Sequence, residues 1–185
     1  MTYPVFSPEP LLMPLLTKFK AITTIALDMD GVLTDGSLLV FEDSRFLRTM
    51  NIKDGYALQL AVKKGFQVLI ISGSHSDAVT TRLQGLGITN IFMKQSDKKA
   101  CLTEYMKENN IRPEQVLFMG DDIPDFQVMK AVGLACAPND AAEEIKSIAH
   151  YISPYCGGKG CVRDVIEKVL KMNGAWELET GIASK

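Results

Sequence analysis

The sequence predicts an α/β fold with a doubly wound, Rossmann-like parallel sheet and a β-hairpin that protrudes after the first strand. Apolar runs alternate along the chain with segments of helical periodicity, which is typical of successive βα units with helices on both faces of a sheet. The runs are continuously apolar, as expected for strands that are buried on both faces. The chain has 185 residues, the size of one ordinary domain, and no second domain is expected.

The elements of this sheet follow from the order of the runs. The expected strands are residues 22–27, 67–72, 90–93, 115–120, 133–137 and 150–153. The expected helices are residues 54–64, 75–85, 97–109, 123–131, 140–148 and 162–172. Ser96 and Asn139 are the expected N-caps of two of these helices, because their side chains can accept hydrogen bonds from first-turn backbone N–H groups.

One segment, residues 36–51, breaks the alternation. It contains two β runs around Glu42, Asp43 and Ser44, so a hairpin fits better than a helix. The hairpin would protrude from the C-terminal end of the first strand. Open α/β sheets place their ligands at that edge.

Composition and charge exclude several functional classes. Hydrophobic residues make up 46% of the chain and charged residues 23%, which indicates a globular protein rather than a disordered one. The formal net charge of −2 gives no basis for a nucleic-acid or anionic-membrane partner. No apolar run reaches the roughly 18 to 20 residues of a membrane span, so no membrane partner is expected.

The termini flank one domain. Residues 1–19 are expected to be an extension, a tail or short helix lying on the domain of residues 20–172, with residues 173–185 as a C-terminal tail. The extension has no basic n-region and contains four prolines, which argues against a signal peptide. A cytoplasmic location follows as the default. Free thiols are expected at all four cysteines, Cys101, Cys136, Cys156 and Cys161.

Acidic residues follow two of the expected strands. Asp28 and Asp30 end the first strand, and Asp121 and Asp122 follow strand 115–120. The carboxyl ends of parallel strands meet at one edge of a sheet, so these groups should lie together there. Crowded carboxylates are costly unless a cation sits among them. An oxygen-rich site of this kind suits a hard cation such as Mg²⁺.

Ser72 and Lys98 fit phosphate chemistry at the same edge. Ser72 ends strand 67–72, where its hydroxyl and nearby backbone N–H groups could grip a phosphoryl oxygen. Lys98 opens a helix, where its charge opposes the helix dipole unless it has an anionic partner. Taken singly, Ser72 also fits a plain turn and Lys98 a solvated face.

Four motifs in order, DMDGVLTDG, ISG, SDK and GDDIPD, resemble those of the haloacid dehalogenase superfamily of phosphotransferases. The resemblance covers about residues 22–172, and the second aspartate, Asp30, is typical of its phosphatase branch. The segments DGVLTDG, NIKDGYALQLAVKKG and GGKGCVRDVIEKVL are most similar to the 3-deoxy-D-manno-octulosonate 8-phosphate phosphatases. Relatives acting on nonulosonate 9-phosphates share them.

This resemblance implies a capless, Mg²⁺-dependent hydrolase that takes phosphate from a small-molecule 2-keto-3-deoxy sugar acid phosphate through an aspartyl-phosphate. Octulosonate 8-phosphate, an intermediate of lipopolysaccharide biosynthesis, is the expected substrate. The alternative is a nonulosonate 9-phosphate, of deaminoneuraminate or N-acetylneuraminate. The family also implies a homotetramer in which the hairpin contributes to assembly and neighbouring subunits help to close each active site.

The resemblance assigns roles residue by residue. Asp28 is the expected nucleophile and Asp30 the acid and base. The expected Mg²⁺ ligands are Asp28, the Asp30 backbone carbonyl and Asp121, with Asp122 in support and Asp125 behind them. Ser72 and Lys98 are expected to neutralise phosphoryl charge.

Substrate specificity is predicted less sharply. Thr34 and Asp35 are expected near the leaving group, and Lys53 or Arg163 near the sugar carboxylate, from the same or a neighbouring chain. Arg82 recurs in the family pattern, or it pairs with a local acid. After ISG, octulosonate phosphatases commonly place Arg and a nonulosonate relative places Glu, whereas this chain has Ser74.

Two other readings remain beside the phosphatase. A receiver domain of a signalling protein uses similar residues, but it pairs its acids after the first strand and is phosphorylated on a later one. Persistent stoichiometric labelling by acetyl phosphate would favour that phospho-receiver switch. An inactive binding module is the other alternative, although every catalytic motif position is filled. The tail, with Trp176, either folds across a site or is a disordered terminus.

Overall fold

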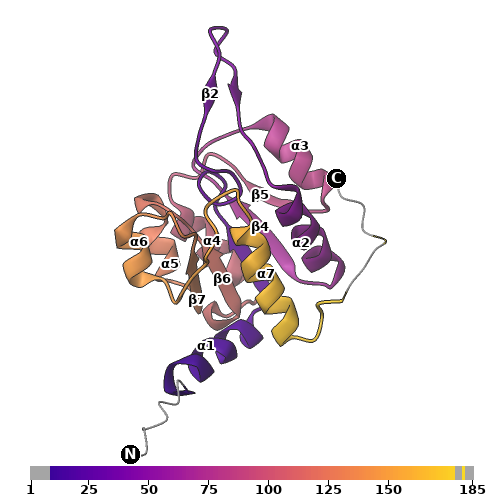
Figure 1. The fold of residues 1–185 in the computed structure, drawn as a ribbon, viewed down its shortest axis with the longest axis vertical. Helices are drawn as coiled ribbons and strands as arrows, with labels where there is room; N and C mark the ends of the chain where they lie inside the picture. Colours follow the sequence, from indigo (N-terminus) through magenta and orange to yellow (C-terminus); the bar gives the residue numbers. More distant parts are fainter. Residues whose placement is uncertain (1–8, 178–180, 182–185) are drawn as a thin grey trace, which may run out of the picture.

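A six-stranded parallel sheet forms the centre of the molecule, in the order β5-β4-β1-β6-β7-β8 (Figure 1). The computed structural model describes residues 9–177 and 181. All five strand pairings of this sheet are parallel, which confirms the predicted fold class. The strands are β1 (Thr24–Leu27), β4 (Gln67–Ile71), β5 (Asn90–Phe92), β6 (Val116–Met119), β7 (Leu134–Ala137) and β8 (Tyr151–Ile152).

The central strand β1 is buried on both faces, which explains its continuous apolar sequence. Ile25 and Leu27 pack into one core cluster and Ala26 into the other. Leu27 pairs with Ile70 of β4 on one side and Met119 of β6 on the other. These pairings bring the ends of β1, β4 and β6 to the same level.

Helices cover both faces of the sheet (Figure 1). Residues of α2, α3 and α7 build the core on one face, and residues of α4, α5 and α6 build the core on the other. The bounds are α1 (Glu9–Ala21), α2 (Ile52–Lys63), α3 (Asp77–Gly85), α4 (Lys98–Glu108), α5 (Phe126–Met129), α6 (Glu143–Ile148) and α7 (Cys161–Met172). Two 3-10 turns, η1 (Pro113–Gln115) and η2 (Ile123–Asp125), complete the elements.

Helix α1 packs against α7 at the end of the sheet opposite the hairpin (Figure 1). Phe19 is buried and meets the Tyr151 ring edge-on at 5.5 Å between ring centroids. Lys18 Nζ donates to the backbone carbonyl of Gly133 at 2.7 Å. These contacts attach residues near the predicted boundary at 19 to the domain.

The helices begin within a few residues of the predicted positions, and two predicted N-caps and one predicted helix are wrong. The N-cap of α4 is Asp97 instead of Ser96, because the Asp97 carboxylate accepts from Ala100 N at 2.9 Å. Helix α6 begins at Glu143 with Ala142 at its N-cap position, so Asn139 is not the N-cap of this helix. The helix predicted over residues 123–131 divides into η2 and the short α5, since Pro124 sits in its first turn.

The segment after β1 forms the predicted hairpin. Strands β2 (Leu39–Val40) and β3 (Phe46–Leu47) pair antiparallel, and Ser44 turns the chain with a φ of 65°. The hairpin projects from the body of the protein (Figure 1). Its apolar side chains stay exposed.

Two further predictions concern the cysteines and membrane-spanning helices. All four cysteines lie within the described residues, and each is a free thiol, as predicted. Across residues 9–177, none of the helices has the length and apolar character needed to cross a bilayer.

Asp54 of α2 caps the start of α7 from a buried position. The residue is 2% exposed, and its Oδ1 accepts from Arg163 N at 2.7 Å. Its Oδ2 has no hydrogen-bond partner among the described residues. Burial raises the pKa of Asp54 from 3.8 to about 6, against the opposing effect of the backbone donors. A charged Asp54 is therefore costly in the folded protein.

We expect Asp54→Asn to remove part of the pH dependence of stability. A raised folded pKa means that the stabilisation is full below about pH 4 and is lost as the pH rises through about 6. Relative to the Asn variant, the wild type should lose on the order of 2 kcal/mol of unfolding free energy over that interval. Urea unfolding of both proteins from pH 4 to 7.5 measures this difference. Parallel curves would contradict the assignment.

Candidate active site

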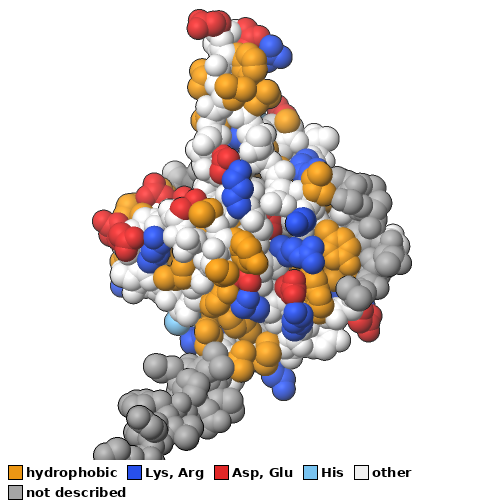
Figure 2. Space-filling view, in the orientation of Figure 1, with side chains coloured by type: hydrophobic (Ala, Val, Ile, Leu, Met, Phe, Trp, Pro, Cys, Tyr) orange, Lys and Arg blue, Asp and Glu red, His pale blue; other side chains and the backbone are white. Residues whose placement is uncertain are grey.

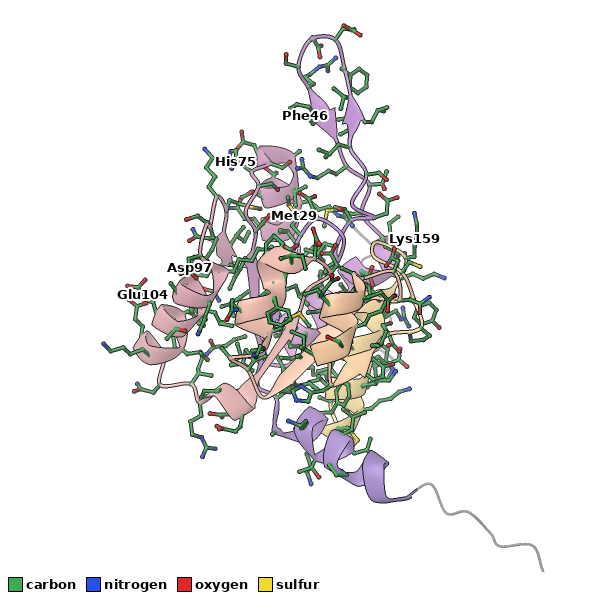
Figure 3. All side chains as sticks on the ribbon, turned by 90° about the vertical axis from the view of Figure 1, so that its left-hand side faces the viewer. Met29, Phe46, His75, Asp97, Glu104 and Lys159 are labelled. Atoms are coloured by element: carbon green, nitrogen blue, oxygen red, sulfur yellow. The ribbon has the colours of Figure 1, made fainter. Side chains whose placement is uncertain are left out.

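The functional side chains gather at the carboxyl edge of the sheet, near the base of the hairpin. Asp28 follows β1, Ser72 follows β4 and Asp121 follows β6 closely. A pocket of about 320 Å³ lies there (Figure 3 shows Met29 at this level and Phe46 far up the hairpin). Its lining residues are Asp28, Asp30, Gly36, Ser72, Gly73, Ser74, Lys98, Asp121, Asp122, Pro124 and Asp125.

Lys98 is buried between two carboxylates. Its Nζ lies 2.8 Å from Asp28 Oδ1 and 2.6 Å from Asp125 Oδ1, and its side chain is 7% exposed. Burial alone would lower the pKa of Lys98, but the charges of Asp28 and Asp125 raise it above its usual value. Lys98 therefore stays charged, and it has the anionic partners that its place at a helix start predicted.

The carboxylates of Asp28 and Asp121 lie in an environment that disfavours their charged forms. Burial, then the charge of Asp125, raises the pKa of Asp28 to about 6 in spite of Lys98. Burial and the charges of Asp28 and Asp125 raise the pKa of Asp121 to about 8. A single lysine is thus too little positive charge for this group of acids.

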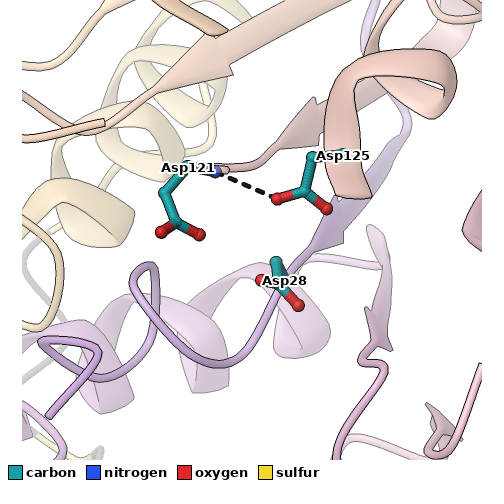
Figure 4. A group of neighbouring side chains, drawn as sticks. All are labelled: Asp28, Asp121 and Asp125. Atoms are coloured by element: carbon teal, nitrogen blue, oxygen red, sulfur yellow. Dashed lines mark hydrogen bonds between the residues drawn. The ribbon is translucent and has the colours of Figure 1, made fainter. Parts of the chain in front are cut away.

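A divalent cation fits the space between these acids. Carboxylate oxygens of Asp28, Asp121 and Asp125 lie within 4.8 Å of one another (Figure 4). Among the described residues, the buried Asp121 Oδ1 has no hydrogen-bond partner, and Asp28 Oδ1 has no aligned donor beside its ion pair with Lys98. Asp125 is different, because Lys98 donates to its Oδ1 and Asp121 N donates to its Oδ2 at 3.0 Å. Asp125 therefore orients its neighbours, and Asp28 and Asp121 keep oxygens available.

Glycines let two loops approach this site closely. Gly31 has a φ of 90°, and a Cβ there would lie 2.0 Å from the Asp121 carboxylate. Gly158 N donates to Val32 O at 2.9 Å, and a Cβ on Gly157 would lie 1.9 Å from Gly31 O. The GGKG segment thus packs on the loop after β1, so larger side chains are excluded at these positions.

The Asp30 carboxylate is held beside the pocket by four donors. Arg48 Nε donates to Oδ1 at 2.7 Å and Arg48 Nη2 to Oδ2 at 3.1 Å. Ser74 Oγ donates to Oδ2 at 2.7 Å and Thr34 Oγ1 to Oδ1 at 3.3 Å. Burial would raise the pKa of Asp30, but the bonds from Arg48 and Ser74 and the charge of Arg48 lower it. The four hydrogen bonds hold the Asp30 carboxylate in one orientation at the pocket.

Ser72 is buried at the same edge, at 2% exposure. Its Oγ accepts from Ser74 N at 3.2 Å and lies 3.2 Å from Ser74 Oγ. The position suits a hydroxyl that contacts an anion in the pocket. The plain-turn alternative describes the backbone here, since Ser72 also shapes the turn into Ser74.

Of the remaining predicted site residues, one lines the pocket and the others do not. Thr34 supports Asp30 from behind, and Asp35 pairs with Lys159 at 3.2 Å; neither lines the pocket. Asp122 lines it with an exposed side chain and is outside the group of three close acids.

Lys53, Arg82 and Arg163 lie in other grooves. Lys53 and Arg163 line a groove of about 480 Å³ beside α7, where Arg163 also stacks over the rings of Tyr56 and Trp176. Arg82 lies against α2 next to the hairpin, and its buried Nε has no partner among the described residues. Within one chain, these three cations do not line the acidic pocket.

The C-terminal tail is described only in part. Trp176 meets Tyr56 edge-on, and Glu177 pairs with Lys64 at 2.7 Å, so this portion lies on α2 and α7. Residues 178–180 and 182–185 are outside the described residues. Whether the tail folds across a site therefore stays a prediction.

Sequence reasoning missed Arg48. It placed residues 36–51 in a hairpin but gave none of them a role in the site. The only signal was an arginine at the end of a return strand that re-enters the ligand-binding edge. Asp125 was expected behind the ligands, and it does support both Lys98 and Asp121.

Chemically, this pocket combines a buried carboxylate beside an ammonium, a second carboxylate held by donors, and a cation site. That set suits displacement at a phosphoryl group.

Comparisons with known proteins agree with this chemistry. The family model for haloacid dehalogenase-like hydrolases matches residues 74–163. The 3-deoxy-D-manno-octulosonate 8-phosphate phosphatase of Salmonella typhi is 35% identical over 159 residues, covering 86% of this chain and 85% of that protein.

Solved structures extend the similarity to the whole fold. The phosphatase of the same name from Yersinia pestis has a TM-score of 0.88 at 32% identity, covering 91% of each chain. The one from Moraxella catarrhalis, solved with magnesium, phosphate and the sugar acid KDO, has a TM-score of 0.84 at 31% identity. It covers 86% of this chain and 92% of that one.

Proposed function

The chain belongs to the haloacid dehalogenase superfamily, in the family of the 3-deoxy-D-manno-octulosonate 8-phosphate phosphatases, and from this we propose its reaction. We propose a Mg²⁺-dependent phosphatase that hydrolyses the phosphomonoester of a 2-keto-3-deoxy sugar acid, with octulosonate 8-phosphate as the first candidate. The observation that carries the proposal is the buried Asp28–Lys98 pair, 2.8 Å apart, in a pocket that Asp30, Ser72 and Asp121 also line.

In the first step, a carboxylate oxygen of Asp28 attacks the phosphorus of the substrate. The bond between phosphorus and the sugar oxygen breaks as the new bond to Asp28 forms, and Asp30 gives its proton to the departing oxygen. Lys98 and Ser72 stabilise the charge on the phosphoryl oxygens. The products of this step are the free sugar acid and an aspartyl-phosphate at Asp28.

In the second step, water attacks the same phosphorus. Asp30, now ionised, accepts a proton from that water while the bond from phosphorus to Asp28 breaks. Inorganic phosphate leaves, and Asp28 returns as a carboxylate. Asp30 is protonated again for the next turnover, so the atoms and protons balance over the cycle.

Asp28, Asp121 and the backbone carbonyl of Asp30 would hold the Mg²⁺, with Asp122 at the margin of the pocket. When bound, Mg²⁺ supplies charge neutralisation for the attacking carboxylate and the phosphoryl group. Asp125 holds Lys98 and the Asp121 backbone in place for this.

A neighbouring chain would complete the site that binds the sugar. Lys53 and Arg163 lie away from the acidic pocket of their own chain, so we assign them to the sugar carboxylate in an adjacent subunit. Arg82 beside the hairpin is a further candidate for this contact. Ser74 contacts Asp30 and leaves open whether an eight- or nine-carbon acid fits better.

A homotetramer would bring such neighbours together through the hairpin. Leu39, Val40, Phe46 and Leu47 are 53 to 63% exposed, and hydrophobic side chains gather along the hairpin in Figure 2. Exposed apolar surface of this kind marks an interaction site. Light scattering of the purified protein should give the mass of four chains, whereas a monomer mass would contradict this proposal.

Phosphate release from three substrates tests the proposed function. We expect Mg²⁺-dependent release from octulosonate 8-phosphate, slower release from a nonulosonate 9-phosphate, and slower still from 4-nitrophenyl phosphate. Removal of the metal with EDTA should stop all three, and added Mg²⁺ should restore them, because the carboxylates alone repel the substrate dianion. Preference for the nine-carbon acid would correct the substrate, and no release from any of them would contradict the enzyme.

A further inference from the structure

The hairpin supplies a buried arginine to the active site. Arg48 follows β3, where the chain returns to the body of the protein, and its side chain is only 8% exposed. Its guanidinium donates to both oxygens of the Asp30 carboxylate, at 2.7 and 3.1 Å. Asp30 is its only ion-pair partner among the described residues. A fork of this kind fixes the plane of a carboxylate as well as its position.

The other two donors to Asp30, Ser74 and Thr34, are hydroxyls, which can accept hydrogen bonds as well as donate them. A guanidinium has N–H donors and no acceptor, so Arg48 can only donate hydrogen bonds to Asp30. The Ser74 hydroxyl can rotate, and Ser72 Oγ lies 3.2 Å away as an alternative acceptor. Ser74 donates only to Oδ2 and Thr34 only to Oδ1, whereas Arg48 donates to both oxygens and so fixes the whole carboxylate.

We propose that Arg48 is a positioning residue for the acid and base function of Asp30, because among the described residues it is the one side chain that donates to both oxygens of that carboxylate. This inference rests on the proposed phosphatase reaction. It makes the return strand of the hairpin part of the catalytic machinery, because the orientation of Asp30 depends on where that strand enters the site.

The proposal predicts a dependence on the leaving group. An alkoxide leaving from a sugar phosphate needs a proton from Asp30, whereas 4-nitrophenolate leaves as a stable anion and does not. The value of kcat/KM covers the steps up to loss of the leaving group. Loss of Arg48 should therefore lower kcat/KM for the sugar phosphate much more than for the aryl phosphate.

The experiment compares kcat/KM of Arg48→Ala and Arg48→Lys on octulosonate 8-phosphate and on 4-nitrophenyl phosphate. Arg45→Ala is the matched control, since Arg45 is on the same hairpin but is exposed, pairs with Asp43 and does not line the acidic pocket. We expect Arg48→Ala to lose about 10²-fold on the sugar phosphate, a typical acid–base contribution, and less than about tenfold on the aryl phosphate. Arg48→Lys should recover part of the difference, and guanidinium chloride at millimolar concentration should rescue Arg48→Ala on the sugar phosphate.

The ratio of the two kcat/KM values is independent of the fraction of folded enzyme, so a folding defect cannot imitate the effect. Equal losses on both substrates, or an unchanged or higher value on the sugar phosphate, would overturn the role of Arg48. A wild type that cleaves neither substrate would instead overturn the phosphatase on which the inference rests.

Discussion

Asp28→Asn is expected to lower the rate of phosphate release from octulosonate 8-phosphate by about 10⁴-fold or more, the scale of losing a covalent nucleophile. The amide has nearly the same shape but is not a nucleophile. It also removes one charge from the pair with Lys98 and one ligand from the cation site. Initial rates at saturating Mg²⁺ measure the loss.

The control for this variant is Asp77→Asn, an exposed aspartate at the start of α3. It makes the same chemical change away from the pocket and should leave the rate unaltered. Thermal melting of both variants shows whether they are folded. A folded Asp28→Asn protein with a rate within tenfold of wild type would exclude Asp28 as the nucleophile.

Lys98→Met is expected to have the largest effect on stability as well as a large effect on rate. The change leaves Asp28, Asp121 and Asp125 together without a buried cation, and breaking such a pair costs roughly 3–5 kcal/mol. Activity should fall by about 10²-fold, because a charge that stabilises the phosphoryl oxygens is lost. Urea unfolding in EDTA and initial rates in Mg²⁺ measure the two effects.

The loss of stability should depend on pH and on metal. Without Lys98 the carboxylates have still higher pKa values in the folded state, so the protein should regain stability as the pH falls and they bind protons. Added Mg²⁺ should also restore stability. Lys99→Met is the matched control, because the neighbouring lysine is exposed. Equal stability of the two variants in EDTA at pH 8 would contradict the buried-charge argument.

Much of the fold was predictable because the buried strands form clear apolar runs in the sequence. β1 and β6 are buried at every position, so they appear as unbroken apolar runs that end in aspartates. Since parallel strands end at one edge, the meeting of Asp28 with Asp121 followed from the pattern alone. Lys98 was recognisable because a lysine at a helix start opposes the helix dipole unless it has an anionic partner.

The parts that were not predictable depend on distances that no local pattern encodes. Arg48 reaches Asp30 only because of the direction in which the hairpin returns, and a two-stranded hairpin with exposed apolar residues does not reveal that direction. Asp97 and Ser96 are both good caps, and one residue of loop length decides between them. Arg163 was predicted near the sugar carboxylate, and no sequence pattern indicated that it stacks on two aromatic rings.

The most direct test of the account is the identity of the phosphorylated residue. Enzyme in excess over octulosonate 8-phosphate is quenched in acid during turnover and reduced with borohydride, which converts an aspartyl-phosphate to homoserine. Peptide mass spectrometry then locates the change. The account predicts homoserine at position 28 and at no other aspartate, dependent on Mg²⁺ and substrate. Reduction at a different aspartate, or none while phosphate is still being released, would contradict Asp28 as the nucleophile.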